Sequence, residues 1–170
     1  DDTVIVRLDP GLAFATGTHP TTALCLEWLD GLAWAGETLF DYGCGSGILA
    51  VAALKLGAGH AIGLDNDPQA LLASHENAAR NGVPERLTLL GVKHPLPPPC
   101  DRLVANILLN PLLELRDRIA ATVKAGGPAT FSGMLKGQEL EFIPRYEPLF
   151  EDFRVHQRED WIRIDARRRG

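Results

Sequence analysis

Short apolar runs alternate with amphipathic stretches along most of the chain. Runs of strand length occupy 38–42, 61–64, 87–90, 102–105 and 129–132, and segments with apolar residues at helical spacing lie between several of them. Strands that alternate with helices favour right-handed parallel crossovers and helices on both faces of one sheet. The pattern therefore predicts an α/β fold with a mostly parallel sheet.

The predicted helices carry start and stop signals of their own. They cover 20–32, 48–56, 68–81, 111–123 and 138–146. Proline opens the first and third helices, and Asp67 and Asn110 precede prolines as N-cap residues do. A further strand is predicted at 3–8. Two further runs lie at 150–157 and 160–166. Their short connection predicts an antiparallel hairpin at one edge of the sheet.

Composition excludes several classes of function. Of the 170 residues 45% are apolar and 23% charged, and the net charge is −5, which is typical of a globular domain and disfavours a general nucleic-acid-binding role. No apolar run approaches the roughly 20 residues of a membrane-spanning helix. Three scattered cysteines and dispersed histidines predict neither a disulfide framework nor a metal site, and they fit a reducing cytoplasm.

The length suits one domain, 1–170, without an internal repeat or a linker. The acidic start lacks an initiator methionine and a signal-peptide pattern. We therefore expect one domain of a longer protein, and a monomer.

The strongest chemical signal is the glycine-rich segment 43–47, which follows a predicted strand and precedes a predicted helix. Alternating glycines let the backbone turn sharply and let a ligand approach closely, which favours a nucleotide-type ligand. Ile48 stands where a dinucleotide fingerprint has its third glycine, so a nicotinamide cofactor is disfavoured. Asp41 suits either a ligand with an ammonium and a sulfonium, or an anchor for the loop through backbone N–H groups.

Other candidate site residues follow predicted strands, at the sheet edge where such folds bind ligands. Asp65 is placed to accept both hydroxyls of an adenosine ribose, and Asn66 to contact an adenine edge. Asp67, directly before Pro68, is instead expected to cap the next helix. Asn106 ends the fourth strand, where its amide would orient a nucleophilic amine or contact a cofactor.

The long loop 9–18 and the first helix form another candidate region. Phe14 has no apolar partner near it in sequence, and loops of this kind carry function when a rigid scaffold positions them. The Thr22 hydroxyl would meet a cofactor carboxylate. Thr18 is expected to be an N-cap and His19 a surface residue, with a catalytic base as the alternative. The small size of Cys44 is sufficient to explain it.

The segment 41–47 (DYGCGSG), together with Asp65, resembles the cofactor motifs of class I S-adenosylmethionine-dependent methyltransferases, which have a Rossmann-like sheet. The segments 9–22 and 106–112 look like the signature loop and the post-strand motif of the PrmA family. The resemblance covers about 9–133. Ala15 stands where the family usually has glycine, and the family's N-terminal substrate-recognition domain has no counterpart here.

The resemblance implies a cytoplasmic enzyme that uses S-adenosylmethionine to methylate lysine side chains and the N-terminal amine of ribosomal protein L11, without a metal or a membrane. Its cofactor contacts would fall on Phe14, Thr22, Gly43, Gly45, Asp65 and Asn106. Phe14 and its loop would close an apolar entrance that keeps the acceptor amine neutral.

Two other functions stay open at this point. A methyltransferase that acts on a nucleobase amine usually has Pro-Pro-aromatic after the fourth strand, and 107–109 lacks that stacking aromatic. A non-catalytic RNA-binding module would use Arg167–Arg169.

Overall fold

The computed structural model describes residues 19–170. Its strands are β1 (Thr38–Tyr42), β2 (His60–Leu64), β3 (Leu87–Leu90), β4 (Arg102–Asn106), β5 (Pro128–Leu135), β6 (Phe150–Arg158) and β7 (Trp161–Arg168). Its helices are α1 (Pro20–Asp30), α2 (Ile48–Leu56), α3 (Pro68–Arg80), the short 3-10 helix η2 (Pro84–Arg86), α4 (Leu109–Glu114), α5 (Arg116–Ala120) and α6 (Glu139–Tyr146). The predicted strand 3–8 lies outside the described residues.

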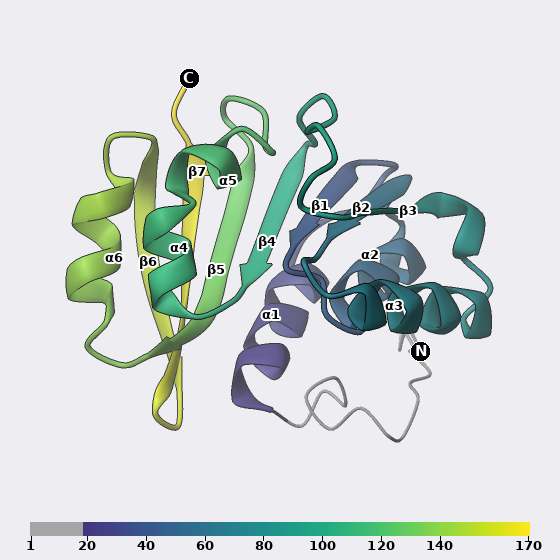
Figure 1. Cartoon of the computed structure of the whole chain (residues 1–170). Coiled ribbons are helices and arrows are strands. Elements are labelled where there is room, and N and C mark those ends of the chain that lie inside the picture. The colour runs from purple at the N-terminus through teal and green to yellow at the C-terminus, as the bar shows by residue number, and fades with distance from the viewer. Residues whose placement is uncertain (1–18) are drawn as a thin grey trace.

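The seven strands form one sheet in the order β3-β2-β1-β4-β5-β7-β6 (Figure 1). The strands β1 to β5 pair in parallel, and β7 runs antiparallel to both β5 and β6. The α/β sheet with its antiparallel hairpin edge is confirmed. The strand order reverses between β1 and β4. The helices that follow these two strands, α2 and α4, lie on opposite faces of the sheet, and such a switch point is where sheets of this kind bind ligands.

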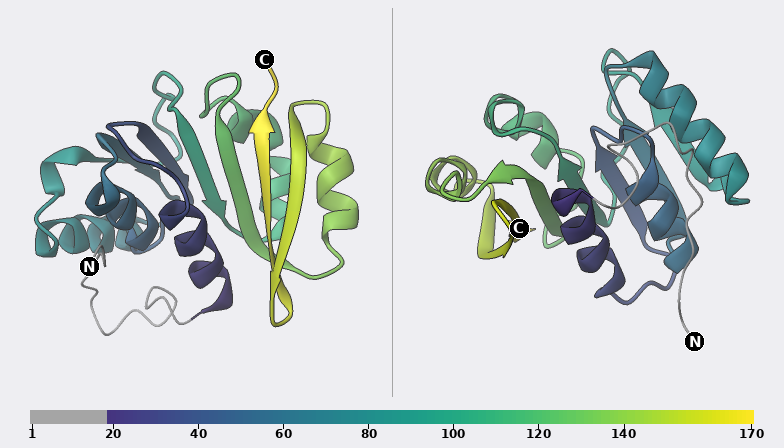
Figure 2. Two further views of the ribbon diagram at one scale, coloured as in Figure 1. Left: turned by 180° about the vertical axis from the view of Figure 1, so that it is seen from behind. Right: turned by 90° about the horizontal axis from the view of Figure 1, so that it is seen from below.

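Helices cover both faces of the sheet and enclose two hydrophobic cores (Figure 2). The core under α4, α5 and α6 is built around Phe131 and Tyr146, and the core under α1, α2 and α3 around Leu29 and Val51. Successive residues of a strand point to opposite faces. The strands β1, β2 and β4 therefore contribute side chains to both cores, as Leu103 and Val104 of β4 do.

The helix predicted over 111–123 is two short helices instead. The chain changes direction at Leu115, which has φ −99° and ψ 15°, and Val123 forms an isolated bridge with Cys100. The N-cap of α4 is Leu108, so the prediction that Asn110 is the N-cap was wrong. Pro111 is tolerated because it lies in the first turn, where backbone N–H groups have no helical acceptor.

A close backbone contact fixes the segment that follows β4. Gly133 in β5 has φ +90°, and a Cβ there would overlap the backbone of Ile107. We expect Gly133→Ala to lower the free energy of unfolding by about 3 kcal/mol, from strain and overpacking together. Urea unfolding measures this loss. Gly137→Ala is the matched control, because Gly137 has φ +97° with open space around it. Equal losses in both variants would refute the contact.

Candidate functional site

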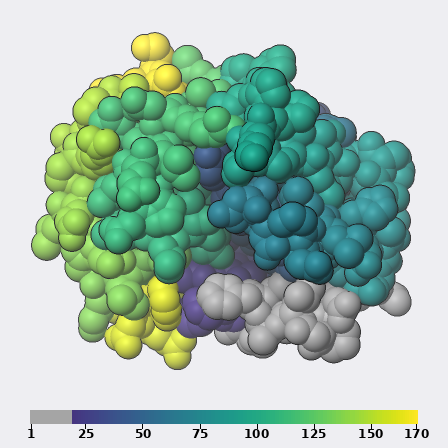
Figure 3. All heavy atoms as spheres, viewed as in Figure 1, coloured from purple at the N-terminus to yellow at the C-terminus, as the bar shows by residue number. Residues whose placement is uncertain are grey.

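A cleft of about 390 Å³ opens at the carboxyl ends of the parallel strands. Figure 3 shows this hollow between the green surface of α4 and α5 and the blue surface around the end of β2. It is lined by Tyr42, Gly43, Leu64, Asp65, Asn66, Val92, Ile107, Pro111, Leu115 and Arg118. The structure thus brings the predicted Gly43, Asp65 and Asn66 together, in a largely apolar cleft of a size that suits a small ligand.

The glycine-rich loop uses its glycines in different ways. Gly43, Gly45 and Gly47 all have positive φ, which only glycine adopts without strain. A Cβ at Gly43 would overlap Ile107, and one at Gly47 would lie within 3.0 Å of Ser74. A Cβ at Gly45 would meet nothing within 4 Å. Gly43 and Gly47 therefore permit packing, whereas Gly45 leaves room beside the backbone for a ligand.

Two buried side chains of α3 hold this loop. Ser74 Oγ donates to the carbonyl of Gly45 at 2.8 Å, and Asn77 Nδ2 donates to the carbonyl of Ser46 at 2.9 Å. Both residues are fully buried. Sequence reasoning missed them, although small polar residues three apart in the middle of an amphipathic helix are a usable signal.

Asp65 joins the glycine loop to the start of α3. Its Oδ2 accepts from the Gly45 N–H at 2.9 Å, and its Oδ1 accepts from the Asp67 N–H at 3.0 Å. A carboxylate has about four acceptor sites, so each oxygen can still accept a ligand hydroxyl. Asp67 accepts from the Gln69 N–H and caps α3, which confirms that prediction.

Asp41 is a buried carboxylate beside the cleft. It is 1% exposed, and neither oxygen accepts a hydrogen bond in the described part of the chain. Burial, with a smaller contribution from the Asp65 carboxylate, raises its pKa to about 7 against the opposing effect of the Ala50 amide, which satisfies neither oxygen. Asp65, and not Asp41, anchors the loop backbone. Asp41 is thus a buried carboxyl group without a cationic partner among residues 19–170, and it directly precedes Tyr42 and Gly43, which line the cleft.

Asn106 and Thr22 lie on the α1 side of the sheet edge. Alternation along β4 places Asn106 on the same face as Val104, and Asn106 is opposite Ser132 in register. Asn106 is half-buried, and Thr22 in the first turn of α1 is 2% exposed. Phe14 and Thr18, which the sequence also singled out, lie outside the described residues.

An aromatic contact lies at the start of α1. His19 is the N-cap of this helix, with its Nδ1 3.3 Å from the Thr21 N–H that it accepts. Its ring is 5.0 Å from that of Trp161, the first residue of β7. His19 is half-buried rather than a free surface residue. Sequence reasoning missed Trp161, because its neighbour in space lies more than 140 positions away in the chain.

Cys44 has the inert role that its size predicts. Burial raises the pKa of its thiol, and the nearby Asp41 carboxylate acts in the same direction. A protonated, buried thiol is a poor nucleophile. Within 19–170, no group of His, Cys, Asp and Glu side chains has metal-site geometry, and no helix has the length and apolar character to span a bilayer.

The chain is similar to known proteins over almost its whole length. A family model described as Ribosomal protein L11 methyltransferase (PrmA) matches residues 1–169. The ribosomal protein L11 methyltransferase of Xanthomonas axonopodis pv. citri (strain 306) is 55% identical over 173 residues, covering 99% of this chain and 56% of that protein. The chain therefore spans little more than half the length of the curated relatives it matches.

Solved structures share its fold. The ribosomal protein L11 methylase of Lactobacillus delbrueckii subsp. bulgaricus matches with a TM-score of 0.86 and 32% identity, over 98% of this chain and 85% of that chain. An RNA methyltransferase from Salinibacter ruber, in complex with S-adenosyl-L-homocysteine, matches with a TM-score of 0.67 and 16% identity, over 86% of this chain and 89% of that chain. At the lower identity the likeness shows the fold alone. The predicted Rossmann-like methyltransferase fold is confirmed.

Proposed function

The chain belongs to the PrmA family of ribosomal protein L11 methyltransferases, and from this membership we propose that it is the catalytic domain of such an enzyme. It uses S-adenosylmethionine to methylate amines of ribosomal protein L11, namely lysine side chains and the N-terminal amine. A ribosomal substrate places the enzyme in the cytoplasm. Further chain, as in the longer relatives, supplies substrate recognition.

One observation of the structure carries the cofactor assignment. The Asp65 carboxylate bonds the backbone of Gly45 at the one position of the glycine loop where space for a ligand is open. A ribose at this place reaches both oxygens of Asp65, and the adenine enters the apolar cleft beside Asn66 and Leu115. The buried Asp41 carboxylate, which has no partner in the part of the chain that the structure describes, suits the cationic end of the same molecule. The residues present therefore fit the cofactor.

The chain's own residues position the acceptor. S-adenosylmethionine, when bound, supplies a methyl group that its sulfonium already activates for transfer to an amine. The protein must align the amine with that group and keep the amine unprotonated. We expect Asn106, at the end of β4, to accept a hydrogen bond from the amine, and the aromatic contact between His19 and Trp161 to help desolvate the amine from the α1 side. Desolvation of this kind lowers the pKa of a lysine.

Asn106→Ala tests the role of the amide in turnover. We expect kcat for methyl transfer to fall about 100-fold while the cofactor Kd changes less than about threefold, because orientation matters in the transition state. Asn66→Ala is the control for a neighbouring amide that lines the cleft but lies away from the acceptor. A wild-type kcat in the Asn106 variant would remove this residue from the site.

Mass spectrometry of the acceptor tests the proposed function itself. The complete enzyme, which joins this chain to the further chain found in its longer relatives, is incubated with methyl-labelled S-adenosylmethionine and purified ribosomal protein L11, with transfer RNA in a parallel reaction. Label on amines of the protein and none on the RNA is the expected result. Label on the RNA alone would contradict the proposal and favour a nucleobase methyltransferase.

A further inference from the structure

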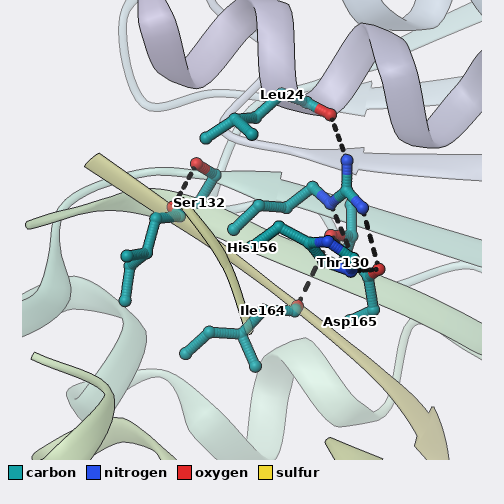
Figure 4. A network of polar contacts seen from close by, with 8 residues as sticks. Leu24, Thr130, Ser132, His156, Ile164 and Asp165 are labelled. Atoms are coloured by element: carbon teal, nitrogen blue, oxygen red, sulfur yellow. Dashed lines mark hydrogen bonds and ion pairs between the residues drawn. The ribbon is translucent and has the colours of Figure 1, made fainter. Parts of the chain in front are cut away.

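A partly buried polar network lies between α1 and the antiparallel edge of the sheet (Figure 4). Arg163 of β7 is 7% exposed, and its guanidinium forms a two-pronged ion pair with Asp165, with N–O distances of 2.8 and 3.0 Å. Thr130 Oγ1 donates to Asp165 at 2.7 Å, and His156 Nε2 lies 3.1 Å from the same carboxylate. Nothing in the proposed reaction uses this network.

The remaining guanidinium nitrogen of Arg163 contacts α1. Its Nη1 donates to the backbone carbonyl of Leu24 in α1 at 2.8 Å. Alternation along β7 explains the direction, since Ile162 and Ile164 belong to the core under α6 and Arg163 therefore points to the α1 face. A guanidinium has a rigid planar fork, so one carboxylate and one carbonyl fix it from two sides. The network thus sets where α1 lies relative to β7.

Stability alone is a poor explanation for such a group. A buried ion pair costs desolvation that often equals its attraction, and apolar residues of the same volume are commonly as stable. The rest of α1 packs on the sheet through Cys25, Trp28 and Leu29, which are buried without any charge. We therefore infer that the Arg163 contact serves mainly to fix the position of α1.

The segment of α1 that Arg163 contacts follows Thr22 directly, and Thr22 is the residue that we expect to meet the carboxylate of the cofactor. Thr22 lies two residues before Leu24, and Cys25 lies one residue after it. Cys25 is fully buried in the same core as Leu39 of β1, and alternation along β1 places Asp41 on that face of the sheet. Burial raises the pKa of the Cys25 thiol, and the charges of Asp41 and Arg163 both act on it, which agrees with this placement. A shift of α1 would thus change the wall that faces Asp41.

We propose that Arg163 is a positioning residue that, through its bond to Leu24 and its ion pair with Asp165, holds α1 where it shapes the pocket for the amino-acid end of the cofactor. The inference rests on the proposed function. The adenosine end lies elsewhere, because Asp65, Asn66 and Leu115 line the cleft on the other side of the glycine loop. The network therefore acts on one half of the ligand only.

The binding of two ligands distinguishes a positioning role of Arg163 from a general structural role. S-adenosylhomocysteine carries both halves, whereas 5′-methylthioadenosine lacks the amino-acid end. Arg163→Lys keeps the charge beside Asp165 but lacks the fork that also reaches Leu24. By calorimetry we expect Arg163→Lys to raise the Kd of S-adenosylhomocysteine about tenfold, and Arg163→Met to raise it more, while the Kd of 5′-methylthioadenosine stays within about twofold in both. If the Met variant does not fold, the Lys variant carries the comparison.

Arg158→Met is the matched control. Arg158 also ties the hairpin to α1, through an ion pair with Glu27 at 2.6 Å, but both side chains are about half exposed. Exposed pairs of this kind contribute little, so neither ligand should bind differently. Equal weakening of both ligands in the Arg163 variants, or no weakening of either, overturns the inference. A wild-type chain that binds neither ligand would instead contradict the proposed function.

Discussion

Asp65→Ala is expected to weaken the binding of S-adenosylhomocysteine to this chain by at least about tenfold, and by up to about 100-fold. The carboxylate is placed to accept ribose hydroxyls, and it also holds the Gly45 and Asp67 amides in place. Its removal costs the ligand charge-assisted hydrogen bonds, and a tenfold to 100-fold loss corresponds to about 1.4 to 2.8 kcal/mol, the contribution of one such bond. Calorimetric titration measures the loss.

Asp67→Ala is the matched control for this effect. Asp67 stands two residues away and caps α3, and it is not among the residues that line the cleft. Its loss should lower the free energy of unfolding by about 1 kcal/mol and leave the ligand Kd within about twofold. An Asp65 variant that is folded and binds the ligand like the wild type would refute the ribose assignment.

Asp41→Asn is expected to have opposite effects on stability and on binding. Burial raises the pKa of Asp41 from 3.8 to about 7, so the folded chain binds the proton more tightly than the unfolded chain does. The free energy of unfolding therefore falls as the pH rises from about 4 to about 7, and the carboxylate destabilises the ligand-free chain above that range. Asparagine is never ionised, so the variant should be more stable at pH 8 by about 2 kcal/mol.

Binding should change in the other direction. A cationic ligand favours ionised Asp41, so the affinity of the wild type for S-adenosylmethionine should rise between pH 6 and pH 8, within the window set by a pKa of about 7. In Asp41→Asn we expect an affinity about tenfold lower at pH 8 and nearly independent of pH. Calorimetry at several pH values gives both results. An unchanged pH profile in the variant would show that Asp41 does not face the cationic end of the cofactor.

Much of the fold could be predicted from the sequence because local signals and tertiary structure agree. Glycines and prolines at the ends of segments, such as Pro68 and Gly57, place helix boundaries, and the apolar runs match β1 and β3 residue for residue. The helix over 111–123 was predicted wrongly because its apolar spacing is continuous. The break at Leu115 comes from tertiary structure: Arg118 donates to the Val92 carbonyl across the cleft, which no local pattern reveals.

The candidate site was predictable in part for a related reason. Residues that directly follow parallel strands must meet at one edge, so Gly43, Asp65 and Asn106 could be grouped without coordinates. The α1 side could not be predicted in this way, because Arg163 and Trp161 reach α1 from β7 across most of the chain. Their role depends on which face of β7 meets α1, and that depends on the strand order.

A structure of the chain with bound S-adenosylhomocysteine tests the central claim most directly. The account predicts adenosine in the cleft at the ends of β1 and β2, with both ribose hydroxyls on the Asp65 carboxylate and the ammonium group towards Asp41. A ligand whose ribose lies away from Asp65, or a cleft that stays empty at saturating ligand concentration, would contradict it.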